Sequence, residues 1–226
     1  ALTLAVSLTA CGGAQTGSAA PAEETDAPAE NSTPFAGKNV SVMTPYLSSI
    51  TTNQMVGYLQ DDLTAQGAEV NVIDTANDFS VLASRIEDVT AAGTDAIVLV
   101  SADPTQLENQ LREAMDAGIP VFGVDSGYID GMQVNATSDN YQMGQLIVNY
   151  LFDDLMGGQG TVIALTHRPH PGVVKRCEAF DDLLPQYSGI SLITEQHVPA
   201  EQPINDAQDI VQNLLLANPE KDSVTA

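Results

Sequence analysis

The stretch Ala117-Gly118-Ile119-Pro120-Val121-Phe122-Gly123-Val124-Asp125-Ser126 decides the fold class, because it has the pattern of a buried strand that stops at a carboxylate. Gly118 is suited to end the preceding helix, and Pro120 stands where the first residue of a strand needs no hydrogen-bond donor. Asp125 then falls at the carboxyl end of the strand, the edge where open parallel sheets bind ligands. The alternative interpretation is a surface turn, Asp-Ser-Gly.

Strand-like and helical segments alternate on both sides of this stretch. Apolar runs at residues 40–43, 69–73 and 96–100 predict strands, and each is followed by apolar residues at helical spacing. Asp78 and Asp103 stand where they can cap two of these helices. Short loops between the units imply right-handed crossovers, and therefore an α/β fold with a parallel sheet flanked by helices.

A second series of the same kind follows a predicted short strand at residues 132–136 and a helix containing Met143, Leu146, Ile147 and Leu151. Its predicted strands and helices cover residues 161–165, 173–184, 190–197 and 205–217. The start of another strand at Ser223-Val224 has no helix after it, so we expect a truncated chain.

The composition is that of a globular chain with a strong acidic excess. Seven Lys and Arg stand against thirty Asp and Glu in 226 residues, which gives a formal net charge of −23. A surface of this sign repels phosphate backbones and anionic lipids, which argues against nucleic acid as a partner.

The amino terminus, residues 1–11, is an apolar run too short to span a bilayer, and we expect it to be the end of an export signal with a lipobox. Its last four residues, Leu8-Thr9-Ala10-Cys11, resemble the bacterial lipoprotein box, which predicts lipid on Cys11 and a membrane-anchored, extracytoplasmic protein. A buried amino-terminal strand is the alternative. Residues 12–37 are rich in Gly, Ala, Pro, Ser, Thr and Glu, and predict a disordered acidic tether.

Several local blocks resemble the type I periplasmic binding proteins for sugars, in particular the ribose-binding group. The blocks, which keep the family's order along the chain, are residues 117–121 leading to Asp125, Ser138-Asp139-Asn140 with Gly144, residues 176–180, and residues 212–215 with 217–219. The resemblance implies two Rossmann-like lobes, residues 38–137 and an incomplete 138–226, with a ligand enclosed between them. It also implies a solute-binding lipoprotein for an ABC importer, with a permease and the membrane as its partners.

The same resemblance implies a sugar site. Asp125 and Arg176 match the family's aspartate and arginine, a carboxylate and a guanidinium that suit vicinal hydroxyls. The family's aromatic first loop is replaced by Ser49-Ile50-Thr51-Thr52, so a ring-stacking contact is lost there. The further ligand-binding candidates are Ser49, Thr51, Tyr46, Ser126 and Gln202, and the expected hinge residues are Ser138, Asp139 and Asn140.

The segment from His167 to Arg176 concentrates basic residues in an otherwise acidic chain, with His167, Arg168, His170, Lys175 and Arg176. An anionic or acidic-sugar ligand, a metal held by the two histidines, and a solvated loop are three interpretations of it. Prolines nearby and the lack of a matching carboxylate set argue against the metal, and we expect neither metal nor cofactor.

No arrangement of residues predicts an enzyme. Cys177 has no Cys-His-Asn constellation around it in the sequence, and Ser126 lacks the Gly-x-Ser-x-Gly context of a nucleophile elbow. Two other classes share the two-lobed fold: a ligand-sensing receptor that signals to a membrane sensor or chemoreceptor, and a lactose-repressor-type regulator. The second should begin with a basic helix-turn-helix, which the acidic amino-terminal region does not resemble.

Overall fold

A computed structural model of the chain describes residues 33–219. The expected signal with Cys11, the tether up to residue 32, and the strand start at Ser223-Val224 lie outside the described residues. The compact unit begins at Thr33. Residues 33–37, predicted as part of the tether, form a turn in which the N–H of Phe35 donates to the carbonyl of Gln66.

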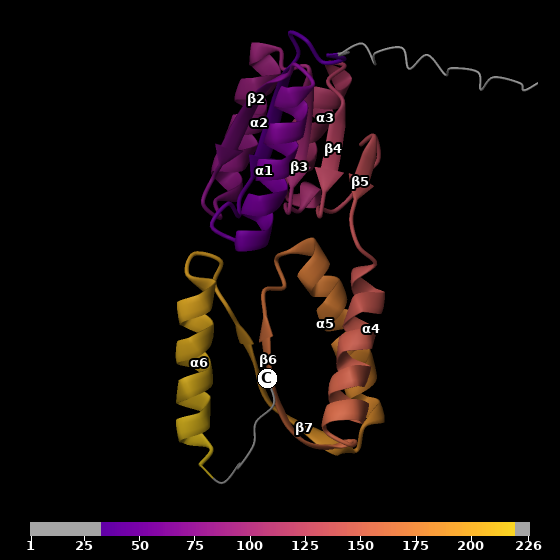
Figure 1. Cartoon of the computed structure of the whole chain (residues 1–226), viewed down its shortest axis with the longest axis vertical. Helices are drawn as coiled ribbons and strands as arrows, with labels where there is room; N and C mark the ends of the chain where they lie inside the picture. Colours follow the sequence, from indigo (N-terminus) through magenta and orange to yellow (C-terminus); the bar gives the residue numbers. More distant parts are fainter. Residues whose placement is uncertain (1–32, 220–226) are drawn as a thin grey trace, which may run out of the picture. The chain divides into compact units, whose positions relative to one another are not determined.

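The first lobe is a five-stranded parallel sheet with strand order β2-β1-β3-β4-β5 (Figure 1). Its elements, in chain order, are β1 (Asn39–Thr44), α1 (Ile50–Ala65), β2 (Glu69–Asp74), α2 (Phe79–Ala92), β3 (Ala96–Val100), the 3₁₀ turn η1 (Pro104–Leu107), α3 (Glu108–Asp116), β4 (Val121–Val124) and β5 (Val134–Ala136).

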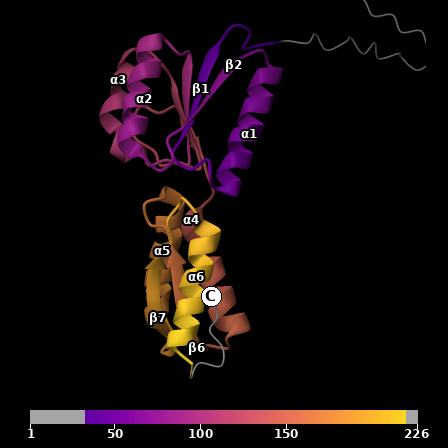
Figure 2. The ribbon, with the colours of Figure 1, turned by 90° about the vertical axis from the view of Figure 1, so that its left-hand side faces the viewer.

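Both faces of this sheet are covered, as the continuous apolar run of β3 predicts. Ile97 and Leu99 belong to a hydrophobic cluster with residues of α2 and α3, whereas Val98 and Val100 belong to a second cluster with α1. Figure 2 shows α1 on one side of the strands and α2 with α3 on the other. The predicted α/β class is therefore confirmed.

Helix starts and strand ends meet at the carboxyl edge of the sheet. The side chains of Asp78 and Asp103 accept backbone N–H groups at the starts of α2 and η1, as predicted, and Ser49 caps α1 in the same way. Ser101 and Asp125, directly after β3 and β4, have positive φ angles of 58° and 47°. This left-handed backbone turns the chain sharply at the strand ends.

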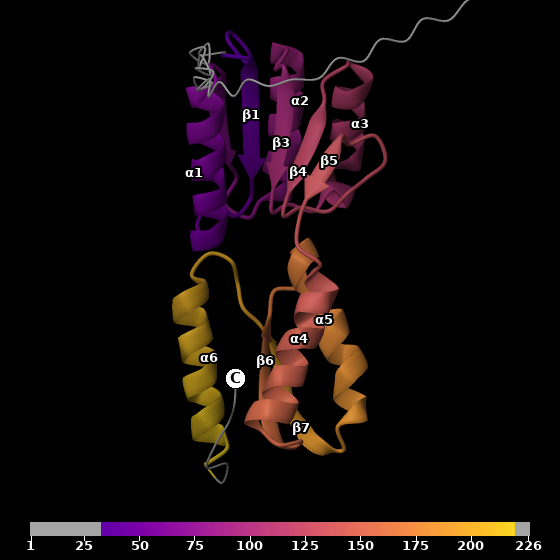
Figure 3. The same cartoon turned by 45° about the vertical axis from the view of Figure 1, so that its right-hand side comes forward.

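The second lobe, in the described residues, has the two parallel strands β6 and β7 and three α-helices. Its elements are α4 (Asn140–Asn149), the π-helical turn η2 (Tyr150–Leu155), β6 (Gln159–Thr166), α5 (Pro171–Leu183), the 3₁₀ turn η3 (Leu184–Gln186), β7 (Gly189–His197) and α6 (Pro203–Ala217). Helices α4 and α5 lie side by side in Figures 1 and 3.

Close packing of α4 on α5 depends on Gly144. A Cβ atom at this position would lie 2.8 Å from the Cα and carbonyl oxygen of Arg176 and from the Cβ of Ala179. The fully buried Phe152 anchors the small core below this contact, with Val162 and Ile190. Gly144 therefore sets the position of the backbone that carries Arg176.

Two further details differ from the sequence predictions. The strand predicted at residues 132–136 is confined to Val134–Ala136, because Met132 is buried in the first core beside the sheet. The helix after Asn140 continues as the π-turn η2, which a 3.6-residue pattern does not distinguish from α-helix. No helix in residues 33–219 is long and apolar enough to cross a membrane.

Candidate ligand-binding site

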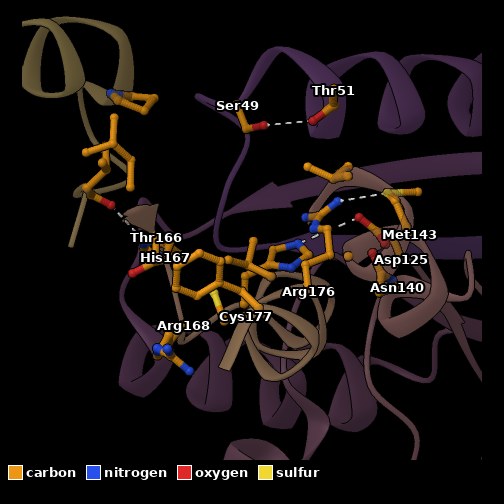
Figure 4. Close-up of a pocket in the computed structure, with 18 of the residues that line it drawn as sticks. Ser49, Thr51, Asp125, Asn140, Met143, Thr166, His167, Arg168, Arg176 and Cys177 are labelled. Atoms are coloured by element: carbon orange, nitrogen blue, oxygen red, sulfur yellow. Dashed lines mark hydrogen bonds and ion pairs between the residues drawn. The ribbon is translucent and has the colours of Figure 1, made fainter. Parts of the chain in front are cut away.

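A pocket of about 930 Å³ is lined by segments of both lobes. It brings together five of the seven predicted ligand-binding residues, with two of the expected hinge residues. These are Asp125, Arg176, Tyr46, Ser49 and Thr51, with Ser138 and Asn140. Figure 4 shows the pocket with many of its polar side chains.

Asp125 lies at the carboxyl end of β4, as predicted. Its N–H donates to the carbonyl of Ala136 at 2.8 Å, which ties the left-handed turn to β5. Its carboxylate accepts a hydrogen bond from Thr137 Oγ1 at 3.3 Å, and its Oδ2 lies 3.7 Å from Nε2 of His170. The backbone and two side chains thus hold the carboxylate at the wall of the pocket.

Arg176 projects from α5 (Figure 4) and is half-buried. Its Nη1 donates to Met143 Sδ at 3.5 Å, a weak acceptor. Among the described residues it forms no ion pair with a carboxylate. A guanidinium has five donors in a planar fork, so most of its hydrogen-bonding capacity is free for a ligand.

His170 lies beside the carboxylate of Asp125 and caps α5, the helix that carries Arg176. In this cap its Nδ1 accepts the N–H of Gly172 at 3.0 Å, and its side chain is only 14% exposed. Burial lowers the pKa of His170; Asp125 opposes this effect, whereas Arg176 and His167 reinforce it. Since Nδ1 accepts a hydrogen bond, the proton of the neutral ring belongs on Nε2, facing Asp125.

Tyr46, two residues after the end of β1, is buried and also lines the pocket. Its ring centroid lies 5.5 Å from that of His167 and 5.9 Å from that of His170, and its hydroxyl oxygen lies 3.5 Å from His167 Nε2. Burial, with the nearby charges of Asp103 and Glu201, raises the pKa of Tyr46 to about 12. Tyr46 is therefore a neutral group with its ring already packed against neighbours.

The start of α1 contributes hydroxyls. Ser49 Oγ and Thr51 Oγ1 lie 3.1 Å apart, and both line the main pocket (Figure 4). They also line a neighbouring cavity of about 420 Å³, in which the structure places Gln202. Gln202 does not line the main pocket.

Ser126 does not line the pocket either, although it follows Asp125. Its side chain is buried, and its hydroxyl donates to the carbonyl of Ala102 at 2.6 Å. Its N–H donates to Asn135 Oδ1 at 3.2 Å. The hydroxyl is therefore engaged in fixing the loop after β4.

The segment expected as a hinge connects β5 to α4. Asp139 caps α4, where its Oδ1 accepts the N–H of Gln142 at 2.9 Å, and Asn140 Nδ2 donates to the carbonyl of Ser138 at 3.2 Å. These hydrogen bonds fix the point at which the segment between β5 and α4 enters the helix. The role of this segment as a hinge stays a prediction.

Sequence reasoning did not assign His167, His170 or Thr137 to the site, although it singled out the segment from His167 to Arg176. Arg168 of the same segment is engaged elsewhere: its guanidinium donates to Glu195 at 2.6 and 2.7 Å and to Asp181 at 3.0 and 3.1 Å. These bonds raise the pKa of Arg168, and Arg168 lowers the pKa of Glu195.

In the part of the chain that the structure describes, no group of three or more His, Cys, Asp or Glu could hold a metal.

Residues 40–226 match the family model described as a periplasmic binding protein domain, and the chain belongs to this family. The resemblance recognised in the sequence is thereby confirmed.

Two curated relatives and one solved structure illustrate the relationship. The ribose import binding protein RbsB of Bacillus subtilis (strain 168) is 25% identical over 74% of this chain and 54% of its own length. The putative rhizopine-binding protein of Rhizobium meliloti is 27% identical over 84% of this chain and 62% of its own length. This chain thus spans less than two thirds of either relative.

The solute-binding protein of the 5-methylthioribose transporter from Thermotoga lettingae TMO, solved in complex with 5-methylthioribose, superimposes with a TM-score of 0.76. It is 20% identical, and the match covers 82% of this chain and 59% of that one. At this identity the likeness establishes the fold alone.

Proposed function

We propose that this protein is an extracytoplasmic solute-binding protein that captures a sugar or similar polyhydroxylated small molecule for an ABC importer. The observation that carries the proposal is that Asp125 and Arg176 line one pocket, where each retains hydrogen-bonding capacity. A carboxylate accepts two hydroxyl hydrogens and a guanidinium donates in a fixed fork, which together suit vicinal hydroxyls.

Binding between two lobes gives the mechanism. A ligand that contacts β4 of the first lobe and α5 of the second favours the closed arrangement in proportion to its extra contacts there. In this proposal the connection at Ser138-Asp139-Asn140 takes up the hinge motion. An importer permease then distinguishes the closed, loaded protein from the open one.

The names of the relatives support the ligand class. They include a ribose import binding protein, a xylitol-binding protein and a D-apiose import binding protein, all of which bind hydroxylated molecules by name. All are named as binding or import proteins, which agrees with a non-enzymatic role. Membrane attachment through lipid on Cys11 is a further part of the proposal, and it rests on the sequence of residues 8–11.

A thermal-shift screen of sugars, polyols, sugar acids and nucleosides on the full chain tests the proposal, since a ligand that binds only the folded state raises the melting temperature. A ligand at 100 times its Kd stabilises the folded state by about 2.7 kcal/mol. We expect a shift with at least one hydroxylated compound, and its loss in Asp125→Asn. A screen without any shift would contradict the proposal.

A further inference from the structure

Arg176 stands apart from the other basic side chains of the protein. The chain has seven Lys and Arg against thirty Asp and Glu. In residues 33–219, five of these basic residues pair with a carboxylate, namely Lys38, Arg85, Arg112, Arg168 and Lys175. Arg176, within the same range, has no carboxylate partner, although carboxylates outnumber bases several-fold.

The other charged residues that line the pocket also leave Arg176 without a carboxylate partner. Asp125 is the one acidic residue among the described residues that line the pocket, and it already has Thr137 and His170 beside it. The charge of Arg168, the other lining arginine, is balanced by Glu195 and Asp181. The guanidinium of Arg176 is thus the positive group whose donors are left for a ligand.

The first turns of two helices add to this positive character. Ser49 at the start of α1 and Val173 in the first turn of α5 both line the pocket, and neither helix has an acidic residue in its first turn. Ser49 and His170 each accept one N–H group in these first turns, and the helix dipole at such ends favours negative charge. The starts of α1 and α5 therefore add to the positive electrostatic potential of Arg176 in the pocket.

Ring stacking, in contrast, has little to offer a ligand here. Tyr46 already contacts the rings of Phe79, His167 and His170, and Phe180 packs against Phe152. Ring stacking on Tyr46 or Phe180 is therefore a minor source of affinity, and the specificity for a ligand falls to the polar and charged groups of the pocket.

We infer that the ligand carries a carboxylate in addition to its hydroxyls, as an aldonic or uronic acid does. The carboxylate accepts two parallel hydrogen bonds from the guanidinium of Arg176, and hydroxyls donate to Asp125. Such charge-assisted, bidentate bonds are about twice as strong as neutral ones. The inference rests on the proposed function, because it specifies the ligand class of the same pocket.

Isothermal titration of the full chain with matched pairs tests the inference: glucuronate with glucose, galacturonate with galactose, and gluconate with sorbitol. We expect the acid of at least one pair to bind ten-fold or more tightly than its neutral partner, and the preference to weaken in 500 mM NaCl relative to 50 mM. Arg176→Gln should abolish the preference and Arg176→Lys should retain part of it, because Lys keeps the charge but not the fork. Arg112→Gln, an exposed arginine paired with Glu108, should leave it unchanged.

The outcomes separate the inference from the proposed function. Neutral partners that bind as tightly as the acids, or more tightly, overturn the inference and leave the sugar-binding function standing. A preference that survives in a folded Arg176→Gln, checked by its melting curve, overturns the role of Arg176. The absence of binding by every compound, acidic or neutral, contradicts the proposed function itself.

Discussion

The Nε2 atom of His170 lies 3.7 Å from Oδ2 of Asp125. This contact joins the capping residue of α5 to the carboxyl end of β4, and thereby the two segments that supply the charged groups of the pocket. A neutral His170 can donate to the carboxylate, and a protonated one would form an ion pair with it. The ionisation of His170 therefore affects both stability and ligand binding.

We predict that protonation of His170 lowers the free energy of unfolding as the pH falls. Because burial lowers its pKa in the folded protein, the unfolded chain, with a His pKa near 6.5, takes up the proton first. The free energy of unfolding therefore decreases as the pH falls from about 6.5 to the lower folded pKa, by at most about 1.4 kcal/mol per pH unit for one proton. Above pH 6.5 this contribution to the pH dependence is absent.

The matched variant is His170→Asn, because Asn also caps a helix. Urea unfolding of both proteins between pH 5 and pH 8 should show a smaller loss of stability in the variant on the acid side. Parallel curves for the two proteins would show that His170 does not titrate in this range. His167, Asp125 and Arg176, the groups that face His170, stay in place in both proteins.

Gly144→Ala should destabilise the second lobe and weaken ligand binding. The added methyl group would lie 2.8 Å from the backbone of Arg176 and from Ala179, and overpacking of this kind costs about 1–3 kcal/mol. Urea unfolding measures the loss of stability, and titration with a ligand from the screen measures the loss of affinity.

Gly57→Ala is the control for Gly144→Ala. Gly57 lies within α1, and a Cβ there would meet no atom within 4 Å, so the change should stabilise the protein by about 0.5–1 kcal/mol. Equal effects of the two substitutions would contradict the packing role of Gly144.

Ser126→Ala should lower stability without changing ligand affinity. The hydroxyl donates to the carbonyl of Ala102, which also accepts the N–H of Gly127 at 3.2 Å, so the substitution removes one of two hydrogen bonds to this acceptor and costs about 0.5–1.5 kcal/mol. Ser84→Ala, at an exposed position of α2, should change stability by no more than about 0.5 kcal/mol. A marked loss of affinity in a stable Ser126→Ala would show that the residue contacts the ligand after all.

Much of the fold could be predicted because it depends on local patterns. The apolar run of β3 and the capping positions of Asp78 and Asp103 need only neighbouring residues to be recognised, and the structure confirms each. The position of Asp125 at a strand end follows from the same kind of pattern. The order β2-β1-β3-β4-β5, in contrast, depends on long-range pairing that periodicity does not encode.

The site was predictable only in part, for a similar reason. Asp125 and Ser126 are adjacent in the chain, yet only the first lines the pocket, because the second turns inward to bond Ala102. His170 stands far from Asp125 and Tyr46 in the sequence, so no spacing rule predicts their contact. The clustering of basic residues from His167 onward was the available signal, and it did not specify which of them reach the pocket.

The affinity of Asp125→Asn for the best compound of the screen, relative to the unaltered protein, tests the central claim most directly. Asn tolerates the left-handed backbone at this position, so the fold should be retained while the charge is removed. Since hydrogen bonds to charged groups contribute about 1.5–3 kcal/mol, we predict a loss of affinity of about 10- to 150-fold by isothermal titration. An unchanged affinity in the folded variant would contradict a ligand site at Asp125.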